Sequence, residues 1–274
     1  MITYYIKKVD KLRIRKVKFK QNNCEIYIKK DKKIKKIIQK FHKKEINYVV
    51  LDKGLKQNKN FVNALNANNI RIFDGRWLIR YLNIEILEYI VNKANFNKAE
   101  TEIAITTDEI SDFAIETIRA LSKQYKKLTV VTSHIEKLRK IEKEIYDKEG
   151  IMIIISNNLK KSLTKPKIIL NIDFNKEKLN KYKINENAII VNLEGDMKIE
   201  NKRFNGININ DYEVQIGREE IIWRDDKHKF YNKDLFESAI YVRDTYNNIR
   251  KIIKKNKVEI KELYGLNGKI ERFS

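Results

Sequence analysis

The sequence has 274 residues, 42% of them hydrophobic, and a net charge of +22. This length allows one large or two ordinary domains with a substantial buried core. No run reaches the roughly 18 apolar residues of a membrane helix, and the stretch before Leu12 does not resemble a signal peptide. A single cysteine, Cys24, excludes an intrachain disulfide, so we expect a cytoplasmic protein.

The first 30 residues predict a small antiparallel sheet, with strands at 2–6, 12–20 and 24–28. In the middle strand, hydrophobic residues alternate with basic ones, and the alternation shifts by one residue near Lys16, which indicates a β-bulge. One face of this sheet is therefore expected to be apolar and the other basic. Residues 1–44 hold 15 Lys and 2 Arg against three acidic residues, so they carry +14 of the total charge.

This basic face predicts a site for an anionic partner such as nucleic acid or lipid head groups. Tyrosines in the same strands have the stacking surface that single-strand binders use. The alternative is a solvated lysine-rich face that reflects a coding sequence rich in A and T. The candidate anion-binding residues are Arg13, Arg15, Lys18, Lys20, Lys33 and Lys36.

A small α/β region completes the first predicted domain, residues 1–95. Hydrophobic spacing predicts a helix from Asp31 to about Phe41 and further helices around 61–65 and 76–91, with strands at 48–51 and 70–73 between them. The polar segment 92–100 is the best linker candidate. Two further regions are expected: a domain at 96–217 and a C-terminal segment, 218–274, whose helix at 235–253 packs back on the rest of the chain.

Residues 102–193 predict strand, helix, strand, helix, strand, strand, helix, strand. The strands are short runs rich in Ile and Val, at 103–105, 128–131, 151–155, 168–172 and 188–193. Apolar runs of this kind suit strands that are buried on both faces. Their alternation with amphipathic helices predicts a parallel sheet with right-handed crossovers. The fold class is therefore α/β, a Rossmann-like parallel sheet domain preceded by a smaller α/β region with an N-terminal antiparallel β-meander.

The second strand of this domain, with Thr132, Ser133 and His134 after it, resembles the corresponding strand of the shikimate dehydrogenase and glutamyl-tRNA reductase type of NADP domain. The resemblance implies an NADP-type domain joined by a bridging helix to a preceding α/β domain. In that type the cofactor would be NAD or NADP, but its binding is not carried over to this chain. The G-x-G-x-x-G turn that cradles the pyrophosphate is missing, because residues 106–111 read Thr-Thr-Asp-Glu-Ile-Ser.

Asp108 in this turn is expected to cap the following helix, which would put negative charge where a phosphate would bind. Any ligand of an open α/β sheet binds at the carboxyl ends of its strands. His134 there is a candidate general base, or else a solvated loop residue. The candidate ligand-binding residues are Thr107, Asp108, Ser133, His134, Asn157, Asn158, Asp173, Glu194 and Gly195.

Other chemistries lack their residues. The three histidines are far apart without metal-ligand spacing, so no metal site is expected. Phosphate-loop and nucleophile-elbow motifs are absent, and Cys24 in its apolar strand is expected to be a buried, inert thiol. We therefore expect no cofactor and a ligand-binding or interaction module with a degenerate nucleotide-binding fold. The alternatives are a divergent NAD(P)-dependent oxidoreductase and a nucleic-acid-associated protein that uses the basic N-terminal sheet.

Overall fold

The computed structural model describes residues 2–9, 17–28, 33–200, 203–217, 229–241 and 244–273. The chain forms two compact units. Unit 1 comprises Met1–Trp77 and Ile216–Arg243, and unit 2 comprises Leu78–Gln215 and Asp244–Ser274. Each unit is therefore built from two separate stretches of sequence. The chain passes from unit 1 to unit 2 at residue 77, ahead of the expected boundary at 95, and the segment after residue 217 is shared between both units.

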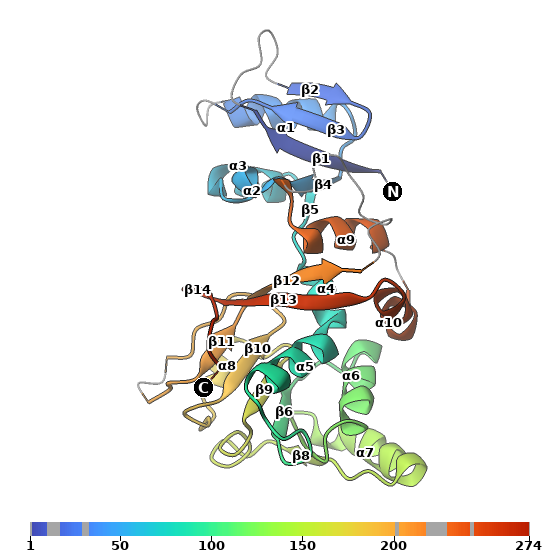
Figure 1. Ribbon diagram of the computed structural model, residues 1–274, viewed down its shortest axis with the longest axis vertical. Helices are drawn as coiled ribbons and strands as arrows, with labels where there is room; N and C mark the ends of the chain where they lie inside the picture. Colours follow the sequence, from blue (N-terminus) through green and yellow to red (C-terminus); the bar gives the residue numbers. More distant parts are fainter. Residues whose placement is uncertain are drawn as a thin grey trace. The chain divides into compact units, whose positions relative to one another are not determined.

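Unit 1 contains a mixed five-stranded sheet in the order β2-β3-β1-β4-β5 (Figure 1). β2 and β3 form an antiparallel hairpin, as predicted, whereas β1 runs parallel to both β3 and β4. The N-terminal meander is thus corrected in one respect, because β1 lies in the middle of the sheet. The predicted bulge near Lys16 lies outside the described residues. The strands are β1 Thr3–Lys8, β2 Val17–Lys20, β3 Asn23–Ile26, β4 Tyr48–Leu51 and β5 Arg71–Phe73.

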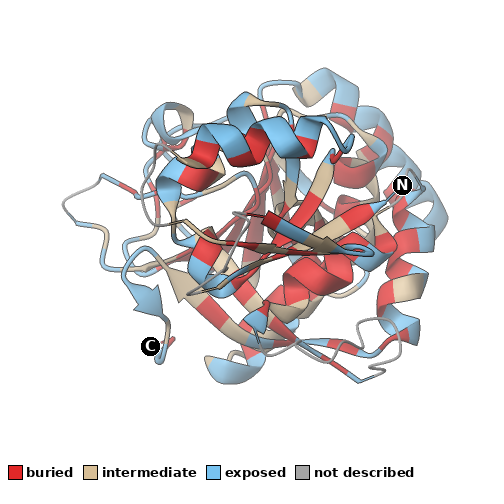
Figure 2. Cartoon of the chain, turned by 90° about the horizontal axis from the view of Figure 1, so that it is seen from above, coloured by how far each residue is buried: buried red, intermediate tan, exposed pale blue. Residues whose placement is uncertain are grey.

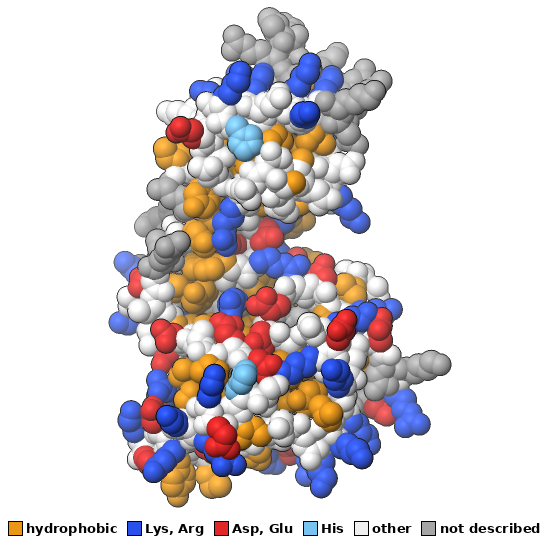
Figure 3. Space-filling model, turned by 180° about the vertical axis from the view of Figure 1, so that it is seen from behind, with side chains coloured by type: hydrophobic (Ala, Val, Ile, Leu, Met, Phe, Trp, Pro, Cys, Tyr) orange, Lys and Arg blue, Asp and Glu red, His pale blue; other side chains and the backbone are white. Residues whose placement is uncertain are grey.

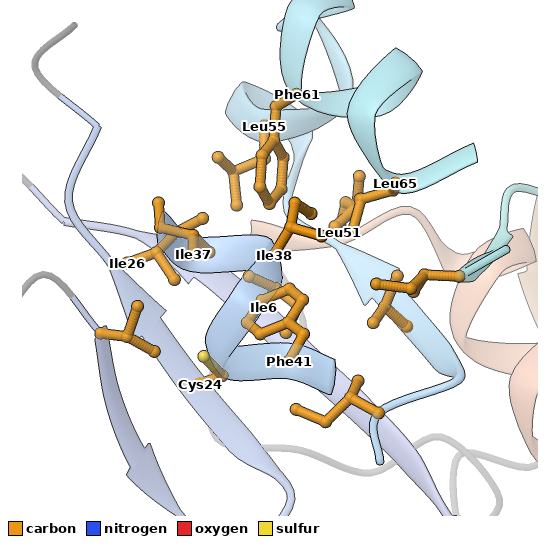
Figure 4. Packing of buried hydrophobic residues seen from close by; sticks show 14 of the residues in the cluster. Ile6, Cys24, Ile26, Ile37, Ile38, Phe41, Leu51, Leu55, Phe61 and Leu65 are labelled. Carbon is orange, nitrogen blue, oxygen red and sulfur yellow. The ribbon is translucent and has the colours of Figure 1, made fainter. Parts of the chain in front are cut away.

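Helix α1 covers one face of this sheet because its apolar stripe meets the apolar side of the strands. Ile37 and Phe41 of α1 are buried with Cys24 and Ile26 of β3 in one hydrophobic cluster (Figure 4). Phe61 of α3 belongs to the same cluster. Helix α9 packs against β4 and β5. The helices are α1 Ile34–His42, α2 Lys53–Lys56, α3 Lys59–Ala67 and α9 Asn232–Ile240, and α4 Arg76–Tyr81 spans the boundary between the units.

Unit 2 contains a six-stranded sheet in the order β11-β10-β9-β6-β7-β8, and all its neighbouring strands pair in parallel. Counted along the chain, this is the order 3-2-1-4-5-6 of the doubly wound Rossmann fold. The predicted alternation of strands and helices over 102–193 is confirmed, and β11 adds a strand that was not predicted. The strands are β6 Glu102–Thr106, β7 Lys127–Val131, β8 Ile154–Ser156, β9 Ile168–Asn171, β10 Ile189–Asn192 and β11 Ile207–Ile209.

The helices of unit 2 differ from the predicted ones mainly in where they break. The helix expected over 76–91 ends at Tyr81, and α5 starts two residues later. The helix expected over 235–253 is divided into α9 in unit 1 and α10 in unit 2. Within unit 2, α10 packs against α6, and Arg250 Nη1 donates to the Tyr81 carbonyl at 2.7 Å. The helices are α5 Asn83–Lys93, α6 Asp112–Ser122, α7 Ile135–Glu149, α8 Lys176–Leu179 and α10 Tyr246–Lys255.

The last described stretch of the chain adds strands that the sequence analysis did not predict. β13 Val258–Gly265 lies between β12 Asp211–Ile216 and the short β14 Gly268–Lys269 in a three-stranded sheet. Figure 2 shows that strands in the molecule are largely buried, while helices turn an exposed side outward. Among the residues that the structure describes, no helix is both long and apolar enough to cross a membrane.

Candidate functional site

The candidate site lies at the carboxyl edge of the unit 2 sheet, meaning the edge at which its parallel strands end. β6 and β9 are neighbours there, although they are not consecutive in sequence. The strand order reverses between them, and ligands of doubly wound folds bind at such a switch point. Asp108 follows β6 and Asp173 follows β9, so the topology brings these two predicted residues to the switch point.

The carboxylate of Asp173 occupies the backbone donors of the β6–α6 turn. Its Oδ1 accepts from the Asp108 N–H at 2.8 Å, and its Oδ2 accepts from the Glu109 N–H at 2.6 Å. Burial raises the pKa of Asp173, and these two N–H groups offset only part of that rise. In a dinucleotide-binding domain the N–H groups of this turn face the pyrophosphate. Here two N–H groups of the turn donate to the Asp173 carboxylate.

Asp108 connects the loop after β6 to the loop after β7, and it does not cap helix α6. The cap of α6 is Ser111, whose Oγ accepts from Ala114 N–H at 3.3 Å, so the predicted capping role was wrong. Asp108 Oδ1 instead accepts from Ser133 N–H at 2.8 Å, beyond the end of β7. Burial alone would raise the pKa of Asp108, but hydrogen bonds from Lys178 and Ser133 outweigh it and hold the pKa below its ordinary value.

Lys178 completes this cluster, and sequence reasoning did not identify it. Its ammonium forms an ion pair with Asp108 and donates to Ser133 Oγ at 2.7 Å. The ammonium also lies 4.0 Å from the centre of the Phe174 ring. Asn175 caps the short helix α8 by accepting from Lys178 N–H at 2.8 Å, and this hydrogen bond holds the backbone of Lys178 in place. The sequence did contain one signal for Lys178. Asn175 is a typical helix cap in the loop after a predicted strand, and Lys178 follows it by three residues, which places a cation near the carboxyl edge of the sheet.

A row of buried polar side chains lies at the last positions of the strands, next to the loops that carry Asp108 and Asp173. Thr106 and Asn171 are register partners, as are Asn171 and Asn192, each at the last position of its strand. Thr106 Oγ1 donates to Asn171 Oδ1 at 2.7 Å, Asn171 Nδ2 to Asn192 Oδ1 at 3.2 Å, and Asn192 Nδ2 to Asn210 Oδ1 at 2.8 Å. All four are almost fully buried. We call these four residues the amide row.

The remaining predicted residues are not joined to the cluster. His134 is exposed at the start of α7, and its N–H donates to Thr132 Oγ1 at 3.0 Å. Asn158 Oδ1 accepts from two N–H groups of its own turn. In the described part of the chain, no hydrogen bond or ion pair links the Asp108–Asp173 cluster to Asn157, Asn158, Glu194 or Gly195. Thr107 is buried, and its Oγ1 accepts from Glu109 N–H at 3.0 Å.

Unit 1 has its own polar cluster at the ends of β4 and β5, which the sequence did not reveal. Lys56 Nζ lies 2.8 and 2.7 Å from the two carboxylate oxygens of Asp234, which is fully buried. Glu237, one turn further along α9, accepts from the Gly75 N–H after β5. Burial raises the pKa of Asp234 to about 6, and burial together with Asp74 raises the pKa of Glu237 to about 8.

The candidate anion-binding residues divide between the two faces of the unit 1 sheet. Phe19 of β2 packs against Phe41 of α1, so its neighbours Lys18 and Lys20 point to the opposite face. Lys33 and Lys36 belong to α1 and its N-terminal cap. Lys18, Lys20 and Lys36 are exposed. Arg13 and Arg15 lie outside the described residues.

The described residues contain no candidate metal site and no reactive thiol. No group of His, Cys, Asp and Glu there is arranged to hold a metal ion. His42 Nε2 lies 3.1 Å from Asn68 Oδ1, and His228 is outside the described residues. Cys24 is fully buried, as predicted, and burial raises the pKa of its thiol to about 12, which keeps it protonated and unreactive.

Comparison with known proteins adds a likeness of fold. No protein-family model and no curated protein matches the sequence. Shikimate 5-dehydrogenase from Listeria monocytogenes is similar over 92% of this chain and 96% of its own, with 10% identity and a TM-score of 0.33. L-tryptophan dehydrogenase from Nostoc punctiforme is similar over 66% of this chain, with 10% identity and a TM-score of 0.32, and the matched part spans about half (53%) of that enzyme.

Aspartate transcarbamoylase from Trypanosoma cruzi is also similar, over 73% of this chain and 72% of its own, with 13% identity and a TM-score of 0.30. These values concern the fold alone. The Rossmann-like class rests on the strand order and parallel pairing of unit 2, which agree with the fold expected from the resemblance to the shikimate dehydrogenase type.

Proposed function

We propose that this chain is a ligand-binding or interaction protein whose Rossmann-like unit does not hold a dinucleotide in the usual cradle. The observation that carries the proposal is the Asp173 carboxylate, which accepts hydrogen bonds from Asp108 and Glu109 N–H at the switch point. A pyrophosphate would have to displace this carboxylate before it could reach the same donors. It would then lie beside two carboxylates, Asp108 and Asp173, that repel it.

The backbone of the turn supports the same proposal. A G-x-G-x-x-G turn uses glycine to bend tightly and to let the pyrophosphate approach. Residues 107–111 contain no glycine, and none of them has a positive φ. The turn therefore follows a path that ordinary side chains adopt without strain, and its side chains occupy the space that glycines would leave open.

The edge offers a different set of groups to a ligand. Asp108 and Lys178 are partly exposed, with 32% and 26% of their side chains accessible, and Ser133 beside them is exposed. A carboxylate, an ammonium and a hydroxyl in contact suit a small polar ligand that carries hydroxyl or amino groups. We infer that such a ligand, and not a phosphate, is the class this edge accepts. The single cysteine, buried and protonated, is in keeping with a reducing, cytoplasmic location.

The test is thermal denaturation of the full chain with NAD, NADP and their reduced forms, with inorganic tripolyphosphate as the matched polyanion. Tripolyphosphate is needed because any polyanion can stabilise a chain of charge +22 through surface lysines. We expect no dinucleotide to raise the Tm beyond the rise given by tripolyphosphate. A larger rise with NAD or NADP would contradict the proposal and favour a divergent oxidoreductase.

The ligand class is tested by the same readout with phosphate-free polyols, amino alcohols and amino acids. We expect a member of this set to raise the Tm of the wild-type chain, and the rise to be lost in Lys178→Met. Arg139→Met is the matched control, because Arg139 is an exposed cation that pairs with Glu136 on α7, away from the switch point. A rise that survives Lys178→Met unchanged would move the ligand away from this edge.

A further inference from the structure

Helix α1 carries a line of lysines along its solvent side. Its apolar residues Ile34, Ile37, Ile38 and Phe41 are buried in the core, which fixes the helix about its axis. From Lys33 to Lys43 the lysines follow one another at intervals of three or four residues, and such positions share a side of a helix. Lys44 follows in the turn after the helix. We call them the lysine ridge: Lys33, Lys36, Lys40, Lys43 and Lys44.

Within the part of the chain that the structure describes, no acidic side chain pairs with the lysine ridge. Helix α1 contains no acidic residue. None of the five lysines forms an ion pair with any other described residue. Lys33 and Lys44, at its two ends, lie over aromatic rings, 5.3 Å from the centre of Tyr27 and 5.4 Å from that of Phe19. These contacts position the two end lysines and leave their positive charge in place.

Helix α7 shows that this imbalance is not a general property of the chain. α7 is also rich in lysine, but its 15 residues hold five basic and five acidic side chains. Arg139 pairs there with Glu136, and Lys148 with Glu144. A coding bias toward lysine would act on both helices alike, so it does not explain why α7 balances its charges and α1 does not. Helix α10 also lacks acidic residues, but its Arg250 pairs with Glu85 of α5. In Figure 3 the charged side chains in the upper part of the view are mainly basic, whereas basic and acidic side chains are mixed in the lower part.

We propose that the lysine ridge binds the phosphate backbone of nucleic acid. From Lys33 at the N-terminal cap to Lys43 at the C-terminal cap, the ridge extends about 15 Å at about 1.5 Å per residue, which suits a row of phosphates better than a single one. Lysine ammoniums are point charges without the fork that reads base edges, so the binding is independent of sequence. A membrane surface is the weaker fit, because amphipathic helices insert their apolar face and that of α1 is already buried in the core.

The test measures fluorescence anisotropy of labelled single-stranded and duplex nucleic acid with the full chain at two salt concentrations. Five phosphate contacts predict that affinity falls on the order of 10²- to 10³-fold between about 50 and about 200 mM salt. The variant Lys36→Glu/Lys40→Glu should bind at least about tenfold more weakly, with the slope of log affinity against log salt smaller by roughly 2. Its matched control is Lys140→Glu/Lys143→Glu on α7, which changes the net charge by the same amount at exposed positions.

Three results would overturn the proposal. The first is no binding by the wild-type chain at the lower salt concentration. The second is equal weakening by the α1 and α7 variants, which would mean that binding follows net charge and not the ridge. The third is binding to vesicles of anionic lipid, sensitive to the α1 substitutions, without binding to nucleic acid. If Lys36→Glu/Lys40→Glu does not fold by circular dichroism, Lys36→Gln/Lys40→Gln replaces it, because Gln has nearly the helix propensity of Lys.

Discussion

Both units have a cluster of charged side chains at the ends of their parallel strands, but the two clusters differ in how deeply they are buried. In both, a carboxyl group from elsewhere in the unit accepts from a backbone N–H that follows a strand: Asp173 in unit 2, and Glu237 in unit 1. In both, a lysine pairs with a second carboxylate nearby. The pair in unit 2, Lys178 and Asp108, is partly exposed, whereas Asp234 in unit 1 is fully buried.

This difference in burial decides how much each cluster contributes to stability. Water screens a partly exposed pair and can replace a lost partner, so such a pair contributes little. A buried carboxylate has no such replacement, and its protonation state becomes a property of the fold. We therefore expect unit 1 to depend strongly on its cluster and on pH, and the edge of unit 2 to be free to meet a ligand.

The largest effect is expected from Lys56→Met. The substitution removes the ammonium that is hydrogen-bonded to the buried Asp234 carboxylate and leaves only Lys233 of the two cations that lower its pKa. Breaking such a buried pair costs about 3–5 kcal/mol of unfolding free energy. Lys56→Met/Asp234→Asn, which removes both charges, should recover much of the loss. Urea unfolding of the two single variants and the double variant measures the coupling. Additive losses would show that the two side chains do not stabilise each other.

Glu237→Gln should change how stability depends on pH. The pKa of Glu237 is about 8 in the folded protein, above its ordinary value of 4.5. Between these values the folded state holds a proton that the unfolded chain releases, so the contribution of Glu237 is present at acid pH and is lost as the pH rises through about 8. Relative to Glu237→Gln, the wild-type unfolding free energy should fall by about 1.4 kcal/mol per pH unit between roughly pH 5 and 8.

Urea unfolding at a series of pH values measures this difference. The charged groups that act on Glu237 are Asp74, Asp234 and Arg71, and they are present in both proteins, so the comparison isolates the single carboxyl group. A difference that stays constant with pH would mean that Glu237 is ionised in the folded state.

Asp173→Ala should open the backbone donors of Asp108 and Glu109 in unit 2. Losing these hydrogen bonds costs about 1–2 kcal/mol, because water reaches the partly exposed turn. The freed N–H groups form an anion-binding turn, so sulfate should raise the Tm of Asp173→Ala more than that of the wild type. Glu194→Ala is the control, since it removes an exposed acid after β10 that does not contact the cluster. An equal sulfate effect in both variants would contradict the prediction.

The smallest effect is expected from Lys178→Met. About a quarter of Lys178 and a third of Asp108 are exposed, so the loss in unfolding free energy should not exceed about 1 kcal/mol. Urea unfolding beside Lys56→Met tests the contrast between the two clusters directly. A loss as large as that of Lys56→Met would remove the distinction between an exposed and a buried pair.

The strand–helix rhythm of unit 2 could be predicted because each strand is a short β-branched run between polar turns. Helix starts were harder. Asp108 and Ser111 are both acceptable caps by sequence, and the structure uses Ser111 because Asp108 is held by Ser133 and Lys178 instead. Local preference alone therefore selected the wrong residue.

The partners within each cluster could not be predicted, because they are distant in sequence. Asp173 lies 65 residues from Asp108, and Asp234 lies 178 residues from Lys56. Strand-end position did identify Asp108, Ser133 and Asp173, since parallel strands bring their ends to one edge. Strand-end position gave no information on Lys178 of α8 or on the acidic residues of α9, because these side chains come from helices and not from strand ends.

The amide row has a consequence for which fold the chain selects. The strands β9 and β10 read Ile-Ile-Leu-Asn and Ile-Ile-Val-Asn, so their apolar residues are almost interchangeable and hydrophobic burial hardly distinguishes one alignment from another. A shift of either strand by one residue would place Asn171 or Asn192 against hydrocarbon, with each unsatisfied polar group costing about 1–3 kcal/mol. The hydrogen bonds among the four side chains form only in the native alignment of neighbouring strands. The amide row therefore contributes more to selecting the strand register than to the stability of the sheet.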